Sequence, residues 1–242
     1  MHRAYLLPLL LIAAPLGAQE FDLVIRNARL IDGTGTPAAT GDLAIRGDRL
    51  AAVGRVAGRG RVEIDAAGRV AAPGFIDVHT HSEDIPQLPL AENFLRMGVT
   101  TIVTGNCGTS RVDVADFFDT IRRTGTGVNV ATLVGQGSVR GQVMGGSFMR
   151  PPTPAEVERM RELVAQAMKD GAVGMSTGLI YLPGTYTKTD ELIELAKVAA
   201  THGGIYASHM RAETLKIFDA IDELVRIARE AKIRAQVSHI KL

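Results

Sequence analysis

The sequence predicts an α/β protein built around a parallel sheet, preceded by a small β region. From residue 73 onward, short apolar runs alternate with amphipathic segments of helical period, the pattern of strand–helix units. The roughly fifty residues before that point contain strand-like runs and turns instead. Six regularly spaced strand starts favour a (β/α)8 TIM-type barrel over an open sheet. We interpret the chain as a fragment of such a barrel, ending four residues after the sixth predicted strand.

The first residues have the layout of a secretory signal peptide. A short basic start, Met1-His2-Arg3, is followed by an apolar run from Ala4 to Leu16 and by the small residues Gly17-Ala18. The apolar run is too short to span a membrane comfortably, although an uncleaved anchor is the alternative. We therefore expect residues 1–18 to be removed and the protein to be exported, either to the periplasm or out of the cell.

Residues 19–72 are expected to form the small β subdomain. Residues 21–26 are apolar and rich in strand formers, and residues 42–50 have the pattern of a hairpin with its turn at Gly47-Asp48. A sheet of this size is marginal in water without a partner surface. Two further short strands are expected at 50–53 and 61–64.

Residues 73–242 are expected to form the first part of the barrel. The turn pair Pro73-Gly74 introduces the first strand. The helix after the third strand has a marked start, because Thr153 and Glu156 form a capping box around Pro154. Strands are expected at 75–78, 100–103, 128–134, 172–175, 205–208 and 234–238, and helices at 90–97, 114–123, 154–170, 190–202 and 214–232.

Four histidines and the only cysteine follow predicted strands. His79 and His81 stand two residues apart after the first strand, so their imidazoles can point to one side. Cys107 follows the second strand, His209 the fifth and His239 the sixth. The carboxyl ends of barrel strands share one face, and imidazole and thiolate are zinc ligands. The alternatives are ordinary polar residues at a strand end and a buried structural thiol.

The composition excludes other classes of protein. With 242 residues, 46% of them hydrophobic, the chain can bury a sizeable core. The 27 basic and 26 acidic residues are mixed along the chain, so nothing indicates a nucleic-acid partner. A single cysteine cannot form an internal disulfide. We expect no membrane partner once the signal peptide is cleaved.

Several motifs resemble one enzyme family. Pro-Gly-Phe-Ile-Asp-Val-His-Thr-His at 73–81 looks like the first-strand signature of the amidohydrolase superfamily, and the region around 30–35 resembles its N-terminal subdomain. Four further segments are similar to the D-aminoacylase (N-acyl-D-amino-acid deacylase) family. They are Gly-Asn-Cys-Gly at 105–108, the glycine-rich stretch 171–181, Tyr-Ala-Ser-His-Met-Arg at 206–211 and Ser-His-Ile-Lys at 238–241.

The resemblance implies a zinc-dependent hydrolase of a linear amide C–N bond. Cys107, His209 and His239 would hold the tighter zinc ion. His79 and His81 would help to form a second, weaker site that shares Cys107. Zinc-bound hydroxide would remove the acyl group from an N-acyl-D-amino acid, so the partner is a small-molecule substrate.

The resemblance also implies roles around the substrate. Tyr181 would donate its hydroxyl, and Lys241 would bind the substrate carboxylate. Arg211 is a second candidate cation, with an ion pair to Glu213 as its alternative. The family's catalytic aspartate matches no position up to residue 242, and Asp77 belongs to the strand signature instead. Other interpretations are a D-aminopeptidase or dipeptidase, and an inert fragment that binds metal without turnover.

Overall fold

The computed structural model describes residues 19–241, and the predicted signal peptide lies outside that range. The chain divides between Pro73 and Gly74 into two compact units, which are described separately. No helix in the described range is long and apolar enough to cross a lipid bilayer.

The first unit is a small sheet. Its strands are β1 (Gln19–Leu30), β2 (Ala39–Arg46), β3 (Arg49–Gly54), β4 (Arg59–Asp65) and β5 (Val70–Ala71). They lie in the order β3-β2-β1-β4, and β5 also pairs with β1. Strands β2 and β3 form the predicted hairpin, with its turn at Gly47-Asp48. The buried core is small and centres on Val24, Ala44 and Val56.

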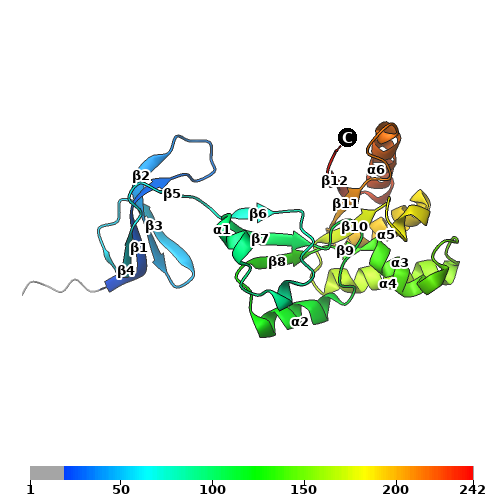
Figure 1. The fold of residues 1–242 in the computed structure, drawn as a ribbon, viewed down its shortest axis with the longest axis horizontal. Helices are drawn as coiled ribbons and strands as arrows, with labels where there is room; N and C mark the ends of the chain where they lie inside the picture. The colour runs from blue at the N-terminus through cyan, green and yellow to red at the C-terminus, as the bar shows by residue number, and fades with distance from the viewer. Residues whose placement is uncertain (1–18, 242) are drawn as a thin grey trace, which may run out of the picture. The chain divides into compact units, whose positions relative to one another are not determined.

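The second unit contains two parallel sheets. Their strands are β6 (Phe75–Asp77), β7 (Val99–Thr104), β8 (Asn129–Thr132), β9 (Val134–Gly135), β10 (Gly174–Gly178), β11 (Ile205–His209) and β12 (Arg234–Val237). One sheet has the order β6-β7-β8 and the other β9-β10-β11-β12 (Figure 1). Every pairing in both sheets is parallel and joins neighbours along the chain, as a barrel of strand–helix units requires.

The prediction of one strand over residues 128–134 is wrong, because the chain changes sheet at Leu133. That residue's N–H still donates to the carbonyl of Thr104 in β7 at 2.9 Å, but β8 pairs with β7 whereas β9 pairs with β10. The fourth predicted strand was also misplaced, since β10 spans Gly174–Gly178 rather than 172–175. Its side chains Ser176 and Thr177 are polar but fully buried, and both are hydrogen-bonded.

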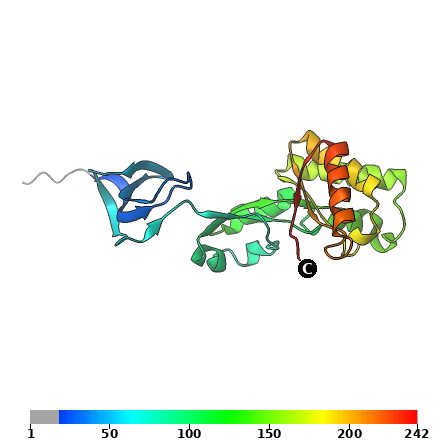
Figure 2. The same ribbon diagram turned by 90° about the horizontal axis from the view of Figure 1, so that it is seen from above.

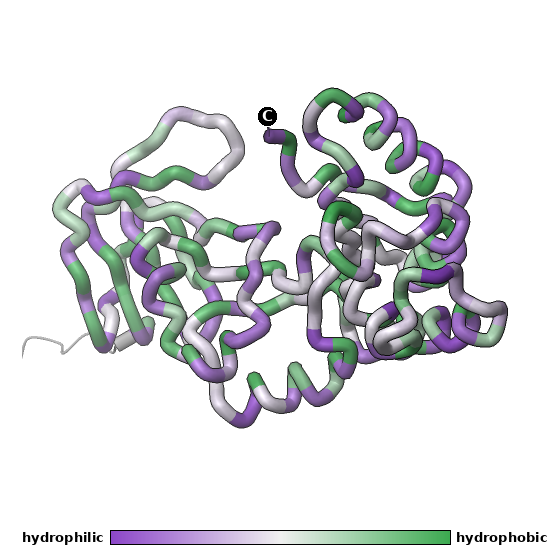
Figure 3. Tube along the Cα trace, turned by 45° about the vertical axis from the view of Figure 1, so that its right-hand side comes forward, coloured by the Kyte–Doolittle hydropathy of each residue, from purple (hydrophilic) through white to green (hydrophobic). Residues whose placement is uncertain are grey.

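The helices of the second unit surround its sheets. They are α1 (Glu92–Arg96), α2 (Val114–Thr124), α3 (Gln136–Met144), α4 (Pro154–Lys169), α5 (Thr189–Thr201) and α6 (Ile217–Ala231), with single 3-10 turns η1 (Ile85–Gln87), η2 (Gly145–Ser147) and η3 (Gly184–Tyr186). Helices α4, α5 and α6 lie side by side next to the second sheet (Figures 1 and 2). Hydrophobic and hydrophilic residues alternate along the helices (Figure 3), and the apolar faces of these three helices supply much of the main core.

The start of α4 matches its prediction. The Thr153 hydroxyl accepts from the Glu156 N–H at 3.3 Å, and the Glu156 carboxylate accepts from the Thr153 N–H at 2.7 Å. Together these bonds satisfy two donors that a helix start otherwise leaves unpaired. Helix α6 begins three residues later than the predicted 214, so residues 212–216 form part of the loop after β11.

Helix α3 was not predicted at all. Its buried residues include Gln136 and Arg140, so the buried face carries polar side chains and no apolar period marks it. The Arg140 side chain is fully buried and pairs with Glu191 of α5. Its second terminal nitrogen donates to the carbonyls of Phe148 and Arg150 at 2.9 and 2.8 Å.

Candidate metal centre

The five predicted ligands converge in the second unit at the ends of four strands. They form two groups of three, namely His79 with His81 and Cys107, and Cys107 with His209 and His239. Within each group the possible ligand atoms all lie within 4.8 Å of one another. The sulfur of Cys107 lies 3.5 Å from Nε2 of His79 and 3.8 Å from Nε2 of His239. Cys107 therefore stands between the two groups.

A strained loop after β7 aims the cysteine sulfur. Cys107 has a φ of 52°, between Gly105 at 78° and Gly108 at 80°, and a non-glycine residue in this region stores strain of about 1–3 kcal/mol. A Cβ on Gly105 would lie 2.1 Å from the carbonyl oxygen of Leu133. Only glycine fits there, so the loop packs backbone against backbone.

Two serines hold this loop in place. The Ser176 hydroxyl of β10 accepts from the Gly108 N–H at 3.0 Å and donates to the Gly105 carbonyl. The N–H of Ser138, in the first turn of α3, donates to the Gly108 carbonyl at 3.0 Å. The loop is thus fixed from two elements that are distant in sequence. This support depends on α3 and on the buried polar residues of β10, both outside the predicted elements.

The imidazoles of His209 and His79 are held in the neutral form that can bind a metal ion. Burial, reinforced by the neighbouring His239, lowers the pKa of His209 to about 4. Burial, together with His81, also lowers the pKa of His79. Both ring nitrogens of His209 and Nδ1 of His79 are buried without a hydrogen-bond partner among the described residues. An unmet buried polar atom costs about 1–3 kcal/mol, and a metal ion would use the single lone pair that each neutral ring offers.

The surroundings of Cys107 favour its protonated thiol over the thiolate. Burial raises its pKa above the ordinary value, and this effect exceeds the opposite influence of Lys241. A thiol in such surroundings is unreactive unless a strong positive charge stabilises the thiolate. The donor set therefore combines neutral imidazoles with a buried sulfur, which suits zinc and similar ions.

Glu213 is a residue of this site to which the sequence interpretation gave the wrong partner. It accepts a hydrogen bond from Nδ1 of His239 and lies 3.5 Å from Nε2 of His209. The alternative role of Arg211, an ion pair with Glu213, is wrong in its partner, because Arg211 pairs with Glu223 at 2.9 Å. In the sequence, only its position four residues after His209 pointed to a contact between Glu213 and that histidine. This spacing brings side chains together on a helix, but Glu213 lies in a loop.

The three side chains proposed to bind the substrate differ in how far other contacts already occupy them. Lys241 has a side chain that is 59% exposed, with its Nζ 4.0 Å from Glu213. The ring of Tyr181 packs edge-on against His209, with centroids 4.7 Å apart, and the residue remains half-exposed. Arg211 also donates to the Thr187 carbonyl at 2.8 Å, so its guanidinium is largely committed to structure. Lys241 and Tyr181 are therefore the available pair.

A small cavity has Cys107 among its lining residues. Its volume is about 190 Å³, and no charged side chain lines it. It is lined by Cys107, Gly108, Thr109, Gly137, Ser138, Gly178, Tyr181, Leu182, Pro183 and Gly184. Such a space suits a small uncharged group.

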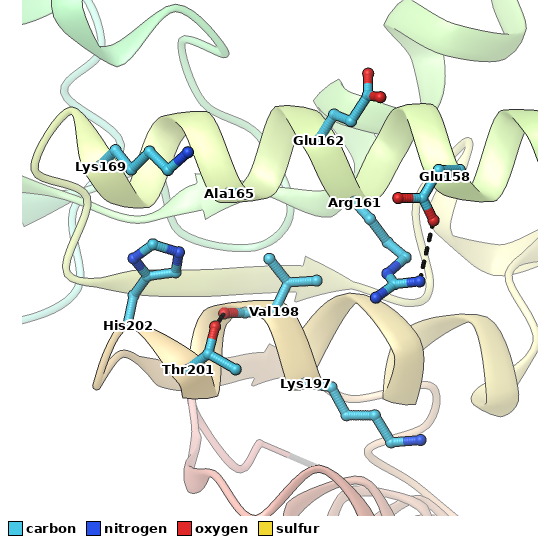
Figure 4. Close-up of a pocket in the computed structure, with 9 residues that line it drawn as sticks. All are labelled: Glu158, Arg161, Glu162, Ala165, Lys169, Lys197, Val198, Thr201 and His202. Atoms are coloured by element: carbon cyan, nitrogen blue, oxygen red, sulfur yellow. Dashed lines mark hydrogen bonds and ion pairs between the residues drawn. The ribbon is translucent and has the colours of Figure 1, made fainter.

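A second hollow lies between α4 and α5 and contains none of the cluster residues. Figure 4 shows its charged lining, in which Arg161 donates to Glu158 and Thr201 donates to the Val198 carbonyl. His202, a histidine outside the predicted cluster, lies at its edge, after the C-terminus of α5. The mixed charges of this groove are typical of two solvated helix faces.

The profile of the amidohydrolase family matches residues 62–241. The chain belongs to the amidohydrolase family. It is 38% identical over 251 residues to a D-aminoacylase from Alcaligenes xylosoxydans xylosoxydans, covering 93% of this chain and 51% of that protein. The resemblance of the motifs to D-aminoacylases is thus confirmed.

Two solved structures of amidohydrolases are similar in fold. One is the N-acyl-D-glutamate deacylase of Bordetella bronchiseptica with zinc and a phosphonate inhibitor, with 35% identity, a TM-score of 0.87, and coverage of 92% of this chain and 52% of that one. The other is a D-aminoacylase from a study of its binuclear metal centre, with 36% identity, a TM-score of 0.86, and coverage of 91% and 52%. The expected barrel-type fold is confirmed. The chain spans about half the length of these relatives.

Proposed function

We propose that the protein is a zinc-dependent deacylase of N-acyl-D-amino acids. The observation that carries the proposal is the pair of three-residue ligand groups that share Cys107, next to an uncharged cavity. Cys107, His209 and His239 would hold the tighter ion, and His79 with His81 would complete a weaker site. When bound, zinc supplies Lewis acidity for the attack of water on an amide carbonyl.

The remaining residues orient the substrate around the ligand cluster. The cavity beside Cys107 fits the uncharged acyl group, whereas the exposed ammonium of Lys241 fits the substrate carboxylate. Tyr181 packs against His209, so it would lie beside the amide that joins these two ends, and its hydroxyl would donate to that amide. A cation at this position favours an acidic N-acyl-amino acid over a substrate with a free amino group, so we prefer a deacylase to an aminopeptidase.

We also propose that the protein is exported. This rests on the sequence of residues 1–18, with its basic start, apolar run and small residues before Gln19. An exported protein with one cysteine gains from burying that thiol, because a free exposed thiol is prone to oxidation. Cys107 is only 7% exposed.

Metal content tests the proposal first. The parent is expected to bind about one equivalent of zinc tightly, and Cys107→Ser to bind almost none, because the variant loses the ligand common to both groups. His202→Gln is the matched control, since this histidine lies outside the cluster. Equal zinc in the parent and in Cys107→Ser, or zinc in neither, would refute the ligand assignment. Hydrolysis of N-acetyl-D-amino acids with little action on the L forms then tests the reaction itself.

A further inference from the structure

We propose that Glu213 is a positioning residue for the metal ligand His239, holding its ring in the orientation in which it and His209 can bind one ion. The inference concerns metal binding, so it rests on the proposed zinc site and not on the substrate. Glu213 lies in the loop between β11 and α6, four residues after His209. Its side chain is only 9% exposed, so solvent competes little for its oxygens.

The contact with His239 decides which nitrogen of that ring faces the cluster. A carboxylate can only accept, so Nδ1 of His239 carries the proton and donates it to Oε1 of Glu213. The neutral ring then has its lone pair on Nε2. That atom lies 3.8 Å from the sulfur of Cys107, on the side where an ion would bind. Carboxylates that hold a ligating histidine in this way set its tautomer and raise its basicity.

The second oxygen of Glu213 faces the other histidine. Oε2 lies 3.5 Å from Nε2 of His209, and the rings of His209 and His239 meet edge-to-face with centroids 4.3 Å apart. One carboxylate therefore hydrogen-bonds to one residue of the tighter group and lies beside a second. Lys241, 4.0 Å away, is a cation beside this carboxylate and offsets its charge.

The chain offers a matched control in Glu223. It lies ten residues further on, in α6, and its side chain is also largely buried, at 12% exposed. It forms an ion pair with Arg211 and accepts from the Thr189 hydroxyl. None of these partners belongs to the histidine cluster. A general loss of packing would affect variants of both glutamates, whereas a positioning role would affect Glu213 alone.

The experiment measures zinc affinity of the full chain by competition with a chromophoric chelator, beside thermal unfolding of the metal-free protein. Glu213→Ala is expected to bind zinc about 10–100-fold more weakly than the parent, the usual effect of losing such a partner. Glu213→Gln keeps an acceptor oxygen and should recover most of this loss. Glu223→Gln should keep the parent's affinity even where it unfolds at a lower temperature.

Nitrogen-15 NMR of the imidazoles in the metal-free protein gives a readout that needs neither zinc nor turnover. His239 is expected to carry its proton on Nδ1 in the parent and to show mixed tautomers in Glu213→Ala. Parent affinity in Glu213→Ala, an equal loss in Glu223→Gln, no recovery in Glu213→Gln, or a parent His239 protonated on Nε2 would each overturn the inference. A parent that binds no zinc but shows the Nδ1 tautomer would instead refute the proposed zinc site.

Discussion

Because Arg140 and Glu191 form a buried ion pair, we predict that removing one of the two charges lowers the free energy of unfolding. The Arg140 side chain is fully buried and that of Glu191 is 5% exposed, so neither charge is compensated by water. Glu191→Gln keeps the volume of the side chain and removes only its charge. Breaking a buried pair from one side costs about 3–5 kcal/mol, and no cavity adds to this cost. We therefore expect the free energy of unfolding to fall by about 4 kcal/mol.

Urea unfolding followed by far-UV circular dichroism measures this change, since the chain has no tryptophan to report by fluorescence. With a slope of about 2 kcal/mol per molar urea, the midpoint should fall by roughly 2 M. A double variant, Arg140→Met with Glu191→Met, is the control. It leaves no unpaired charge and loses the two bonds to the Phe148 and Arg150 carbonyls and the bond from Gln136 to Glu191, at about 1 kcal/mol each. A single variant that loses less than about 1 kcal/mol, or a double variant less stable than the single, would refute the reasoning.

Two further predictions concern the start of α4 and the N-terminal segment. The Arg150 hydrogen bond lowers the pKa of Glu156 from 4.5 to about 2, so the charged form stabilises the fold above about pH 4.5 and this contribution is lost as the pH falls toward 2. Glu156→Gln should therefore lower the melting temperature more near pH 6 than near pH 3, and equal shifts at both would contradict this. The mass of exported protein should correspond to a chain starting at Gln19, and a membrane-bound chain that retains residues 1–18 would contradict signal cleavage.

The features predicted well are those with a local cause. The capping box of Thr153 and Glu156 needs only residues three apart, and the structure forms both of its hydrogen bonds. The convergence of His79, Cys107 and His239 follows from parallel strands that end at one face, so the order of strands was sufficient to bring them together.

The features that were missed depend on polar groups whose partners are distant in sequence. Helix α3 buries Gln136 and Arg140, whose side chains hydrogen-bond to residues of another helix and of loops. Strand β10 buries Ser176 because that hydroxyl bonds the loop around Cys107. A hydrophobicity pattern predicts that such polar residues are exposed. Their burial is stable only with a hydrogen-bond partner, and the pattern does not show that partner.

The protonation states of His209 and Cys107 determine which proton must leave the site when a metal ion binds. The low pKa of His209 keeps it neutral near pH 7, while the raised pKa of Cys107 keeps its sulfur protonated. Without an ion, the cluster thus offers free imidazole lone pairs and a thiol that cannot yet ligate. Binding of a divalent cation must displace that thiol proton, because thiolate is the ligating form. This is why Cys107→Ser is a sharper test than an alanine variant. Serine keeps nearly the same shape in the loop, but its hydroxyl does not release a proton as readily as a thiol.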